Sequence, residues 1–588
     1  MPALSVIDAP AMRQWLHQAH LIAQRSRTVV NALNVFPIPD SDTGTNVLLT
    51  LSAADRAIES LLDADLLSVA QLASTAAVTA ARGNSGLLIS QALAAFADQV
   101  GCSASSEKIR PVELTRALRA MARSSREAIS HPVEATLLTV ADDAACAAEE
   151  TMAASSAQTP ATLEAVITAA VFACQEGVVE TSGHGHGPVD AGAAAFMLML
   201  TALADVISGP ESQYAEVALS MLNDLTATGS VHAQGVPGHD LSHGKGEFEV
   251  MYLFEGTTAQ AAALRERLDR VGHSVGVVGT ADVLGIGLYQ VHVHTDSPRS
   301  ALPVQGKARG VCIHHLHPSS IRAATAEPPL PGQSSSAGGA QVLRLEAARF
   351  ARNRSQQHNE ETDNAAETRQ QRPCAVVACT RAPGLIEQLA RTGAVVSYCP
   401  DRDGIVRAVI DAGAPAVIVL ACDDKSAVDA HAASRSLMAR SRAASSGADT
   451  EPSLTWPNDV IVADTTDEAM VMAGSVAVAS DVLINQRYRH SSEPAAIVQA
   501  ATLAVRHAVA GIRTYTLDAR DQEPADVAAR IIDAVGRDDE LLTVMLGAHA
   551  PSDLPWYIDD AIACGDLDIE VTILKSAQPT PDVLCSLE

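Results

Sequence analysis

Apolar residues recur at helical spacing through the first 210 residues of the chain. Met12, Trp15, Leu16, Ala19 and Ile22 mark the first such segment, which covers residues 10–33. Further segments with this spacing cover residues 45–62, 66–80, 86–100, 112–125, 136–154, 161–177 and 190–208. Because only short polar joints separate them, the pattern predicts an all-α domain of eight helices, a bundle or barrel, over residues 1–210.

The period of the pattern changes after residue 246. Phe248, Val250, Tyr252 and Phe254 alternate with polar or smaller residues, which is typical of a strand. A helical segment follows at 258–271, and strand-like segments follow at 274–278 and 287–294. These features predict a small α+β domain over residues 240–325, preceded by a mixed Gly/His-rich segment.

Residues 331–372 have the composition of a linker. Pro, Gly and Ser open this stretch, and a polar run with almost no apolar residues closes it. Such a segment cannot bury enough surface to offset the entropy of ordering, so we expect it to be disordered. Strands and helices then alternate over residues 373–588, with strands expected at 375–379, 394–398, 416–420, 460–463, 541–546 and 569–574. This alternation predicts an α/β domain, so the chain as a whole is expected to be multidomain.

The stretch from Asn34 to Asn46 carries the strongest chemical signal in the sequence. Two prolines favour extended backbone just before Asp40, and Asp42 lies two positions further on, so both carboxylates can reach one hard cation. An apolar helix follows, and the hydroxyls, amide and glycine at its start come from Thr43, Gly44, Thr45 and Asn46. Together these residues predict a site for Mg²⁺ and phosphate. Taken alone, they are also typical of a turn that caps a helix.

Three further motifs lie in the first 200 residues. They read Ala81-Arg82-Gly83-Asn84-Ser85-Gly86, Glu134-Ala135-Thr136-Leu137-Leu138-Thr139-Val140 and Val189-Asp190-Ala191-Gly192. With the Asn34–Asn46 stretch, they resemble in order the PDGDTGTN, ARGNSG, EGTILTV and VDAGG signatures of the L-type nucleotide-binding domain of dihydroxyacetone kinases. The chain is more similar still to the bacterial fatty acid kinase A family, in which that domain is fused to a middle domain and a DegV-like domain.

The chain departs from the family pattern at glycine positions. Ser41 replaces the glycine between the two aspartates, and Ala135 replaces the glycine of EGT. Ala193, Ala194 and Ala195 stand where the family usually continues with Gly-Gln-Gly. Each replacement matters only if the glycine held a positive φ or a close backbone contact.

The resemblance implies phosphoryl transfer from ATP with Mg²⁺. The chain has no P-loop motif, so it does not resemble the P-loop class of nucleotide-binding enzymes. Asp40 and Asp42 would hold Mg²⁺ and act in catalysis, with Asn34 as a further ligand candidate. The remaining nucleotide-site residues implied are Thr43, Gly44, Thr45, Asn46, Gly83, Asn84, Ser85, Gly86, Thr136, Thr139, Asp190 and Gly192.

These motifs contain no His or Lys that looks like an obligatory base, and this bears on which substrate we expect. A carboxylate nucleophile is already ionised at neutral pH and needs no base, which favours an acyl-phosphate product. The resemblance therefore implies a kinase that phosphorylates a fatty acid presented by a separate acyl-binding, DegV-like protein. Two alternatives remain open, a glycerone (dihydroxyacetone)-type kinase and a catalytically weakened regulatory homologue.

His292 and His294 are two apart on an expected strand, so they share one face and can chelate one metal ion. The family resemblance places a zinc-type site here, with Glu249 where the family has a cysteine. Cys312, His314, His315 and His317 lie nearby in sequence and are further candidates. The alternative is a pair of ordinary strand residues. His184 and His186 fit a mobile lid or a plain loop.

Composition and charge narrow the classes of partner and compartment. The chain of 588 residues has a net charge of −28, which disfavours nucleic acid and anionic membrane surfaces as partners. The ten cysteines show no C-x-x-C spacing and fit a reducing compartment. We find no signal sequence and no run suited to stable membrane insertion, so we expect a cytoplasmic protein, with a homodimer as an open alternative to a monomer.

Overall fold

The computed structural model describes residues 3–34, 42–102, 107–130, 132–156, 158–181, 189–232, 246–281, 285–316, 373–446, 457–479, 494–565 and 569–588. The chain divides into two compact units. One comprises Met1–Lys245, Met251–His294 and Pro303–Ala308, and the other comprises Gly246–Val250, Thr295–Leu302 and Arg309–Glu588. The predicted linker at 331–372 lies outside the described residues.

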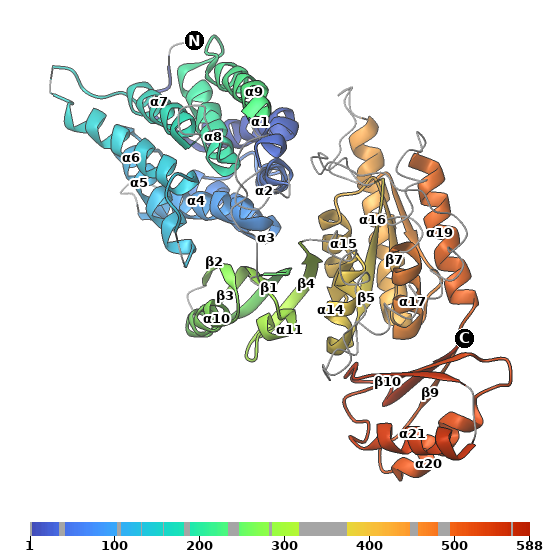
Figure 1. The fold of residues 1–588 in the computed structure, drawn as a ribbon. Coiled ribbons are helices and arrows are strands. Elements are labelled where there is room, and N and C mark those ends of the chain that lie inside the picture. The colour runs from blue at the N-terminus through green and yellow to red at the C-terminus, as the bar shows by residue number, and fades with distance from the viewer. Residues whose placement is uncertain are drawn as a thin grey trace. The chain divides into compact units, whose positions relative to one another are not determined.

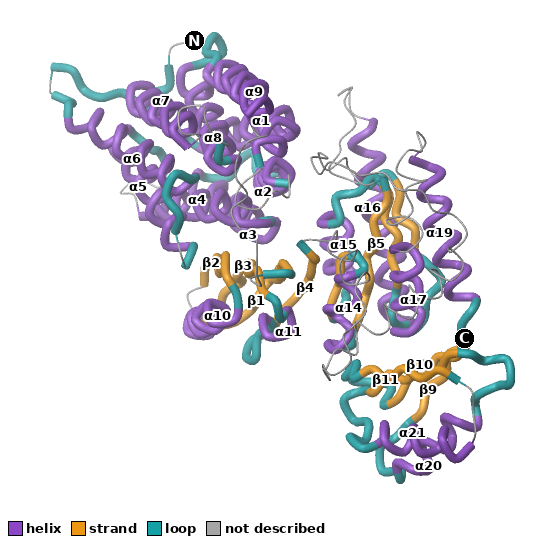
Figure 2. Tube along the Cα trace, viewed as in Figure 1, coloured by secondary structure: helices purple, strands orange, loops and turns teal. Residues whose placement is uncertain are grey.

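The first unit is built mainly of helices (Figures 1 and 2). Its described part before residue 233 contains α1 (Ala9–Leu33), α2 (Thr43–Ile58), α3 (Leu66–Ala80), α4 (Gly83–Cys102), α5 (Pro111–Ala128), α6 (Leu137–Ala153), α7 (Leu163–Thr181), α8 (Ala191–Ser208) and α9 (Tyr214–His232). The all-α prediction is confirmed, and the eight expected helices correspond to α1–α8.

Helix α9 was not expected from the sequence. Its first turn is capped from outside the helix, because the Asp205 carboxylate on α8 accepts the backbone N–H groups of Tyr214 (2.9 Å) and Ala215 (3.0 Å). Ala218 and Leu222 are buried against the neighbouring helices. This long-range cap has no local sequence signature, which explains why residues 209–232 looked irregular.

Consecutive helices pack against each other, and α8 returns to pack against α1, which closes a ring. The start of α2 lies beside the end of α1, where a Cβ on Gly44 would clash with the Arg27 carbonyl. The end of α2 lies beside the first half of α1, where Asp55 contacts His20. The two helices are therefore antiparallel, and an up-and-down ring brings the N-termini of α2, α4, α6 and α8 to one end.

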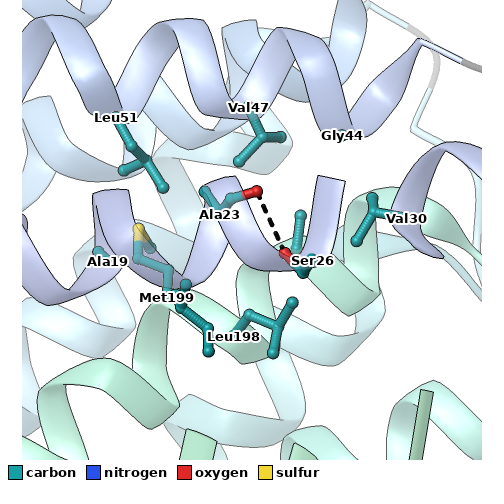
Figure 3. A pocket seen from close by; sticks show the side chains of 11 residues that line it. Ala19, Ala23, Ser26, Val30, Gly44, Val47, Leu51, Leu198 and Met199 are labelled. Atoms are coloured by element: carbon teal, nitrogen blue, oxygen red, sulfur yellow. Dashed lines mark hydrogen bonds between the residues drawn. The ribbon is translucent and has the colours of Figure 1, made fainter. Parts of the chain in front are cut away.

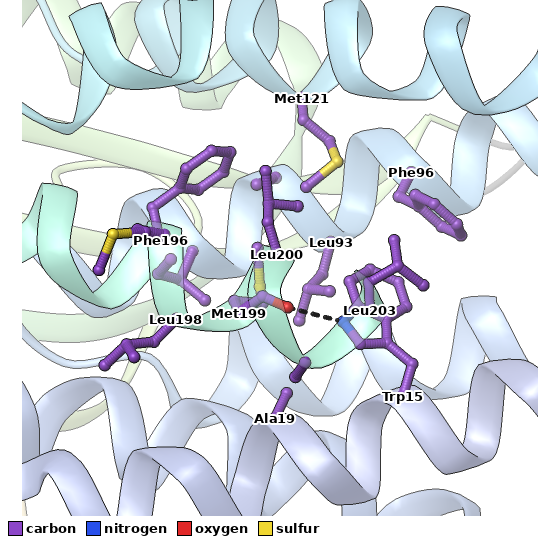
Figure 4. Packing of buried hydrophobic residues seen from close by; sticks show 14 of the residues in the cluster. Trp15, Ala19, Leu93, Phe96, Met121, Phe196, Leu198, Met199, Leu200 and Leu203 are labelled. Carbon is purple, nitrogen blue, oxygen red and sulfur yellow. Dashed lines mark hydrogen bonds between the residues drawn. The ribbon is translucent and has the colours of Figure 1, made fainter. Parts of the chain in front are cut away.

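The core of the helical ring is aliphatic and centred on a few large side chains (Figure 4). Trp15 is fully buried, donates its indole N–H to the Met199 carbonyl at 3.0 Å, and lies 5.0 Å from Phe96 between ring centroids. The single polar group of this side chain is thus satisfied. Helix α8 is apolar on all sides, as expected for a helix surrounded by others.

Among the described helices, α8 alone is long and apolar enough to cross a membrane. Of its 18-residue window, 89% is buried inside the protein. That burial identifies α8 as a core helix of the ring, and its bounds agree with the predicted helical segment at 190–208.

The middle region follows the expected order of strands and helix. It contains β1 (Phe248–Thr257), α10 (Thr258–Val271), β2 (His273–Ala281), β3 (Ile286–Thr295), α11 (Pro298–Ala301) and β4 (Lys307–His315). Strands β2 and β3 are antiparallel, with His273 opposite His294 and Gly276 opposite His292. Gly276 also packs on Leu87 of α4, where a Cβ would clash, so β2 lies against the helical ring.

The second unit carries two sheets layered with helices, which confirms the α/β prediction. In the larger set of strands, β5 (Cys374–Thr380) lies between β6 (Val395–Tyr398) and β7 (Ala416–Leu420), and β8 (Asp459–Val462) follows; these strands are parallel. Their described helices are α14 (Ile386–Arg391), α15 (Arg402–Asp411), α16 (Asp424–Ser446), α17 (Glu468–Val478) and α19 (Pro494–Ala510), with a 3₁₀ turn at Pro383–Leu385.

The smaller sheet has the order β11-β10-β12-β9. Its elements are β9 (Arg513–Leu517), α20 (Pro524–Asp533), β10 (Leu541–Leu546), α21 (Leu554–Gly565), β11 (Glu570–Leu574) and β12 (Val583–Leu587). The two sheets are joined by polar contacts: the Gly384 N–H donates to the Ser576 carbonyl at 2.8 Å, and the Thr514 hydroxyl donates to Asp467 at 2.7 Å.

Glu468 is a buried carboxyl group at the start of α17. It accepts hydrogen bonds from the Thr380 hydroxyl and the Arg381 N–H, both at 2.7 Å, at the end of β5. Burial raises the pKa of Glu468 to about 7, although these hydrogen bonds oppose the shift. The folded protein therefore binds this proton more tightly than the unfolded chain does.

We expect Glu468→Gln to flatten the pH dependence of stability. The stabilising effect of the Glu468 proton is fully present below the unfolded pKa of about 4.3 and is lost as the pH rises through about 7. From pH 5 to 8, the wild type should therefore lose unfolding free energy relative to the variant, by about 1.4 kcal/mol per pH unit at most. Urea unfolding at four pH values measures this difference, with exposed Glu59→Gln as the control. Parallel pH profiles for the wild type and Glu468→Gln would contradict the assignment.

Candidate functional site at the helix N-termini

The first part of the site is the start of α2. Asp42 immediately precedes the helix, and its carbonyl accepts the Asn46 N–H at 2.9 Å, while its carboxylate does not cap the helix. Asn34 is buried at the end of α1. Asp40 and Ser41 lie outside the described residues. Asn34 and Asp42 are therefore the described residues nearest in sequence to Asp40.

The start of α2 is held tightly against α1. Asn31 accepts the Thr45 N–H and donates to the Thr45 hydroxyl, both at 3.1 Å. Gly44 faces the Arg27 carbonyl so closely that any Cβ would clash with it. Thr45 therefore positions the helix end through Asn31, and Gly44 permits the close approach of the two helices.

Helix α4 begins beside α2. Gly83 has a φ of +56°, and a Cβ there would lie 2.7 Å from the side-chain nitrogen of Asn46. A Cβ on Gly86 would lie 2.9 Å from the Thr50 hydroxyl, which donates to the Asn46 carbonyl at 2.9 Å. Two motifs separated by about 40 residues thus meet at one pair of helix ends.

Helices α8 and α6 complete the group. A Cβ on Gly192 would lie 3.2 Å from the Ser85 hydroxyl of α4. The Asp190 Oδ1 atom accepts the Ala193 N–H at 2.6 Å within α8 and the Leu137 N–H at 3.1 Å at the start of α6. Burial raises the pKa of Asp190 despite the backbone N–H groups that it accepts. Asp190 therefore ties two helix N-termini together.

The two threonines of the third motif cap the start of α6. The Thr136 hydroxyl donates to the Val133 carbonyl at 2.7 Å and accepts the Leu138 N–H at 3.3 Å. The Thr139 hydroxyl donates to Glu134 at 2.9 Å and accepts the Ala135 N–H at 3.0 Å. Both hydroxyls thus have local structural partners, and the predicted phosphate contacts of these threonines stay a prediction.

The contacts above connect the N-termini of α2, α4, α6 and α8 into one group. Each helix N-terminus presents unpaired N–H groups and a partial positive charge, so several of them at one place favour an anion. The buried Asn84 Oδ1 atom, in the first turn of α4, has no hydrogen-bond donor among the described residues. A buried acceptor without a donor is costly, so this atom is available to a water molecule, an ion or a donor group of a ligand.

The arginine of the second motif does not serve this group as a phosphate ligand. Arg82 is buried, and its guanidinium donates to the Ala80 and Ala81 carbonyls at 2.9 and 3.0 Å. These carbonyls end α3, where a cation is favourable. These contacts give Arg82 a structural role at the end of α3.

Ala135 occupies a backbone conformation that favours glycine. Its φ is +59°, in the left-handed region that costs a residue with a Cβ roughly 1–2 kcal/mol. Ala193, Ala194 and Ala195, in contrast, lie in the first turns of α8 and are buried, where alanine is well suited to a helix. Of these described departures from the family glycines, only Ala135 carries strain.

We expect Ala135→Gly to stabilise the helical unit by about 1 kcal/mol, because it relieves the left-handed strain just before α6. Chemical denaturation of the full chain measures the gain. Ala193→Gly is the matched control and should destabilise, because glycine lowers the stability of a helix. A loss of stability in Ala135→Gly would show that the positive φ costs nothing here.

The described residues line a small apolar cavity in the helical unit and a larger groove in the second unit. One cavity of about 10 Å³ lies between α1, α2 and α8, lined by residues such as Ala23, Val47 and Met199, and holds at most one water molecule (Figure 3). A groove of about 650 Å³ in the second unit lies at the start of strands β7 and β8, beside Leu503 of α19. Ligands of open α/β sheets bind at the opposite, carboxyl ends of the strands.

The predicted metal ligands of the middle region lie on two strands. His292 and His294 are buried on β3 with their rings 4.8 Å apart, and His273 of β2 lies 5.4 Å from His294. Glu249 is half-buried on β1. The His292 Nδ1 atom lies 3.1 Å from the Ser274 carbonyl, which fixes the ring if Nδ1 carries the proton. His184, His186 and His317 lie outside the described residues.

His315 has a different environment from the predicted ligands. Its Nε2 atom lies 2.9 Å from Glu247, which also pairs with Arg391 at 2.8 Å. The Arg391 guanidinium, helped by His315, lowers the pKa of Glu247 to about 2 despite partial burial. His315 therefore belongs to an ion-pair cluster of the second unit.

Comparison with known proteins finds two family models that match parts of this chain. Residues 37–205 match the family model of the DAK2 domain, and residues 245–316 match that of the fatty acid kinase A-like middle domain. The chain is 29% identical to protein YloV of Bacillus subtilis over 296 residues, which cover 47% of this chain and 49% of YloV. It is 28% identical to an uncharacterized protein of Staphylococcus saprophyticus over 306 residues, 50% of this chain and 52% of that protein.

The chain spans about half the length of these curated relatives. The helical ring with its four motifs is similar to a DAK2 domain, a domain of the kinase class. The region that follows is similar to the fatty acid kinase A-like middle domain, so the chain resembles the fatty acid kinase A family in the order of these two domains.

Some residues that shape the site were not expected from the sequence. Asn31 orients Thr45, and the Arg27 carbonyl requires glycine at position 44. Asn31 precedes Asn34 by one helical turn, which is the signal that could have identified it. The contact with Arg27 depends on the packing of two helices and leaves no local signature.

Proposed function

We propose that the chain is the ATP-dependent kinase component of a fatty acid kinase, and that it transfers the γ-phosphoryl group to the carboxylate of a fatty acid. The observation that carries the proposal is the meeting of the α2, α4, α6 and α8 N-termini, with the buried Asn84 acceptor among them. A separate acyl-binding, DegV-like protein would present the fatty acid. The small apolar cavity of the helical unit has no room for an acyl chain.

The residues present suit ATP with Mg²⁺. Asp40 and Asp42 would hold the ion, with Asn34 beside them, since carboxylate and amide oxygens are the ligands of hard cations. When bound, Mg²⁺ neutralises the charge of the β- and γ-phosphates. Gly83 and Gly86 allow α4 to begin close against Asn46 and Thr50 of α2, and Ser85 and Asn84 would add polar contacts to phosphate.

The chemistry needs positioning and charge more than proton transfer. A fatty acid carboxylate is ionised at neutral pH, so the attacking oxygen requires no general base. The helix ends would stabilise the charge on the phosphoryl oxygens as transfer proceeds. The product would be an acyl phosphate and ADP.

The test of this activity is acyl phosphate formation. The full chain is mixed with ATP, Mg²⁺ and a purified acyl-binding protein that carries a fatty acid, and acyl phosphate is trapped with hydroxylamine as the hydroxamate. We expect product only when all four components are present. ATP binding without any acyl hydroxamate would contradict the kinase proposal.

The strained Ala135 supports a second candidate, a regulatory homologue that binds nucleotide but turns over poorly. Ala135, whose φ is +59°, lies just before α6 and next to the candidate site. If this candidate is correct, Ala135→Gly should raise kcat by at least about tenfold, since 1.4 kcal/mol at the transition state corresponds to that factor. An unchanged kcat would remove the argument for this candidate.

We also propose that His292, His294 and Glu249 bind Zn²⁺. Imidazole nitrogens and a carboxylate are suitable zinc ligands, and the Ser274 carbonyl beside His292 Nδ1 is the kind of partner that orients a ligating imidazole. Zinc would supply folding energy to the middle region.

The zinc proposal predicts about one equivalent of bound metal at this site. Metal analysis of protein prepared without chelators should show this zinc, and His292→Ala/His294→Ala should lose it. A His507→Ala chain provides a control for the loss of a helix histidine. Equal zinc content in the wild type and the double variant would contradict the site.

The remaining expectations concern partners and compartment. The net charge of −28 disfavours nucleic acid, and we propose the acyl-binding protein as the partner. All ten cysteines are free, which suits a reducing compartment, and we propose that the protein acts in the cytoplasm. Whether two copies associate is an independent question that sedimentation of the pure chain answers.

A further inference from the structure

A cluster of two histidines and one aspartate lies at the opposite end of the α1/α2 pair from the candidate nucleotide site. The Nδ1 atoms of His17 and His20 on α1 lie 3.1 and 2.8 Å from the same oxygen, Oδ2 of Asp55 on α2. One ligand atom from each of the three side chains lies within 4.8 Å of the others. The histidines are three positions apart, so they lie on one face of α1.

The separations are close to those of ligands around one metal ion. Tetrahedral bonds of about 2.0–2.1 Å to nitrogen and oxygen put neighbouring ligand atoms about 3.3 Å apart. The two N–O separations of 2.8 and 3.1 Å therefore need to widen by only a few tenths of an ångström. Asp55 Oδ2 and the two imidazole nitrogens that it faces would provide three of the ligand atoms around such an ion.

The aspartate is suited to act as the anionic ligand. Its Oδ2 atom already faces the Nδ1 atoms of both histidines. The His17 side chain is 56% exposed and the other two are 23% and 17% exposed, so ions can reach the cluster and water can complete the coordination.

We propose that His17, His20 and Asp55 bind one divalent transition-metal ion, with Zn²⁺ as the ion that the donor set fits best. Two imidazole nitrogens and one carboxylate oxygen are an established zinc donor set, while Ca²⁺ and Mg²⁺ prefer oxygen ligands only. The bound ion cross-links α1 to α2. Because α2 begins at the candidate nucleotide site, the cross-link fixes the helix that presents Thr43 and Gly44.

The test uses the full chain with His292→Ala/His294→Ala, so that the predicted zinc ligands of the middle region do not contribute. Calorimetric titration with Zn²⁺ should show one site per chain, and Co²⁺ should give the visible absorption of a low-symmetry site. Adding His20→Gln should weaken binding by at least about tenfold, since the loss of a residue that only orients a metal ligand already has an effect of that size. Asp55→Asn should do the same.

The control is His431→Ala in the same background, since His431 is an exposed helix histidine of α16. It should leave Zn²⁺ binding unchanged. Zn²⁺ should also raise the thermal midpoint of the background chain and not that of its His20→Gln variant. Absence of a Zn²⁺ site in the background chain, or equal binding in His20→Gln, would show that the cluster is only a hydrogen-bonded bridge between two helices.

Discussion

Replacement of Asp42 or Asp40 by asparagine is expected to lower kcat/KM for phosphoryl transfer at least about a hundredfold, with the fold intact. Asp42 lies at the start of α2, where its carboxylate makes no hydrogen bond that caps the helix. Loss of a carboxylate would weaken the hold on Mg²⁺ and leave the phosphate charge uncompensated. Steady-state kinetics at saturating Mg²⁺ measures the effect.

The matched control for the aspartate variants is Asp63→Asn, an exposed aspartate between α2 and α3. It removes the same charge from the same region of the chain and should leave the kinetics unchanged. Circular dichroism should show wild-type helix content in all three variants. Wild-type turnover in both Asp40→Asn and Asp42→Asn would remove these residues from the site.

Gly44→Ala is expected to destabilise the helical unit by about 1–3 kcal/mol, the usual cost of overpacking a filled space. The new Cβ would meet the Arg27 carbonyl, a backbone atom that cannot rotate away, and would lie 2.9 Å from Asn31 Oδ1. Because Asn31 orients Thr45, the shift would also displace the first turn of α2. Chemical denaturation of the full chain measures the loss.

Gly101→Ala is the matched control, since it adds a methyl group to another helix of the same unit. Its Cβ would lie 3.4 Å from a Leu67 methyl carbon, an ordinary contact, and alanine favours the helix. The control should be as stable as the wild type or more stable. Equal stability of Gly44→Ala and the wild type would show that α1 and α2 are less closely packed than described.

Helices and strands could be predicted where apolar residues recur at a regular spacing in the sequence. The eight helices of the ring and strands such as β5 and β7 follow from repeating apolar positions, and their existence is confirmed. Helix α9 was missed, because its start is capped by Asp205, nine positions upstream on α8, and not by a residue next to the helix. Strand β4 was also missed, since alternation is weak over Lys307–His315.

The candidate site was predictable as a set of motifs, and less so in the role of each residue. Sequence alone could not show that Asp190 holds the N-termini of α6 and α8, or that Thr136 caps α6. It could state what a positive φ would mean at a replaced glycine, and the structure supplied that φ at Ala135. Contacts between motifs distant in sequence, such as Gly83 with Asn46, required the fold.

Calorimetry of the full chain with ATP and Mg²⁺ tests most directly whether the helix N-termini form a nucleotide site. We predict one ATP per chain, Mg²⁺-dependent binding, and at least about tenfold weaker binding for Asn84→Ala, which removes the buried acceptor. The Asp63→Asn chain should bind ATP like the wild type. A folded chain that binds no ATP, or an Asn84→Ala chain that binds ATP as tightly as the wild type, would contradict the assignment of this site.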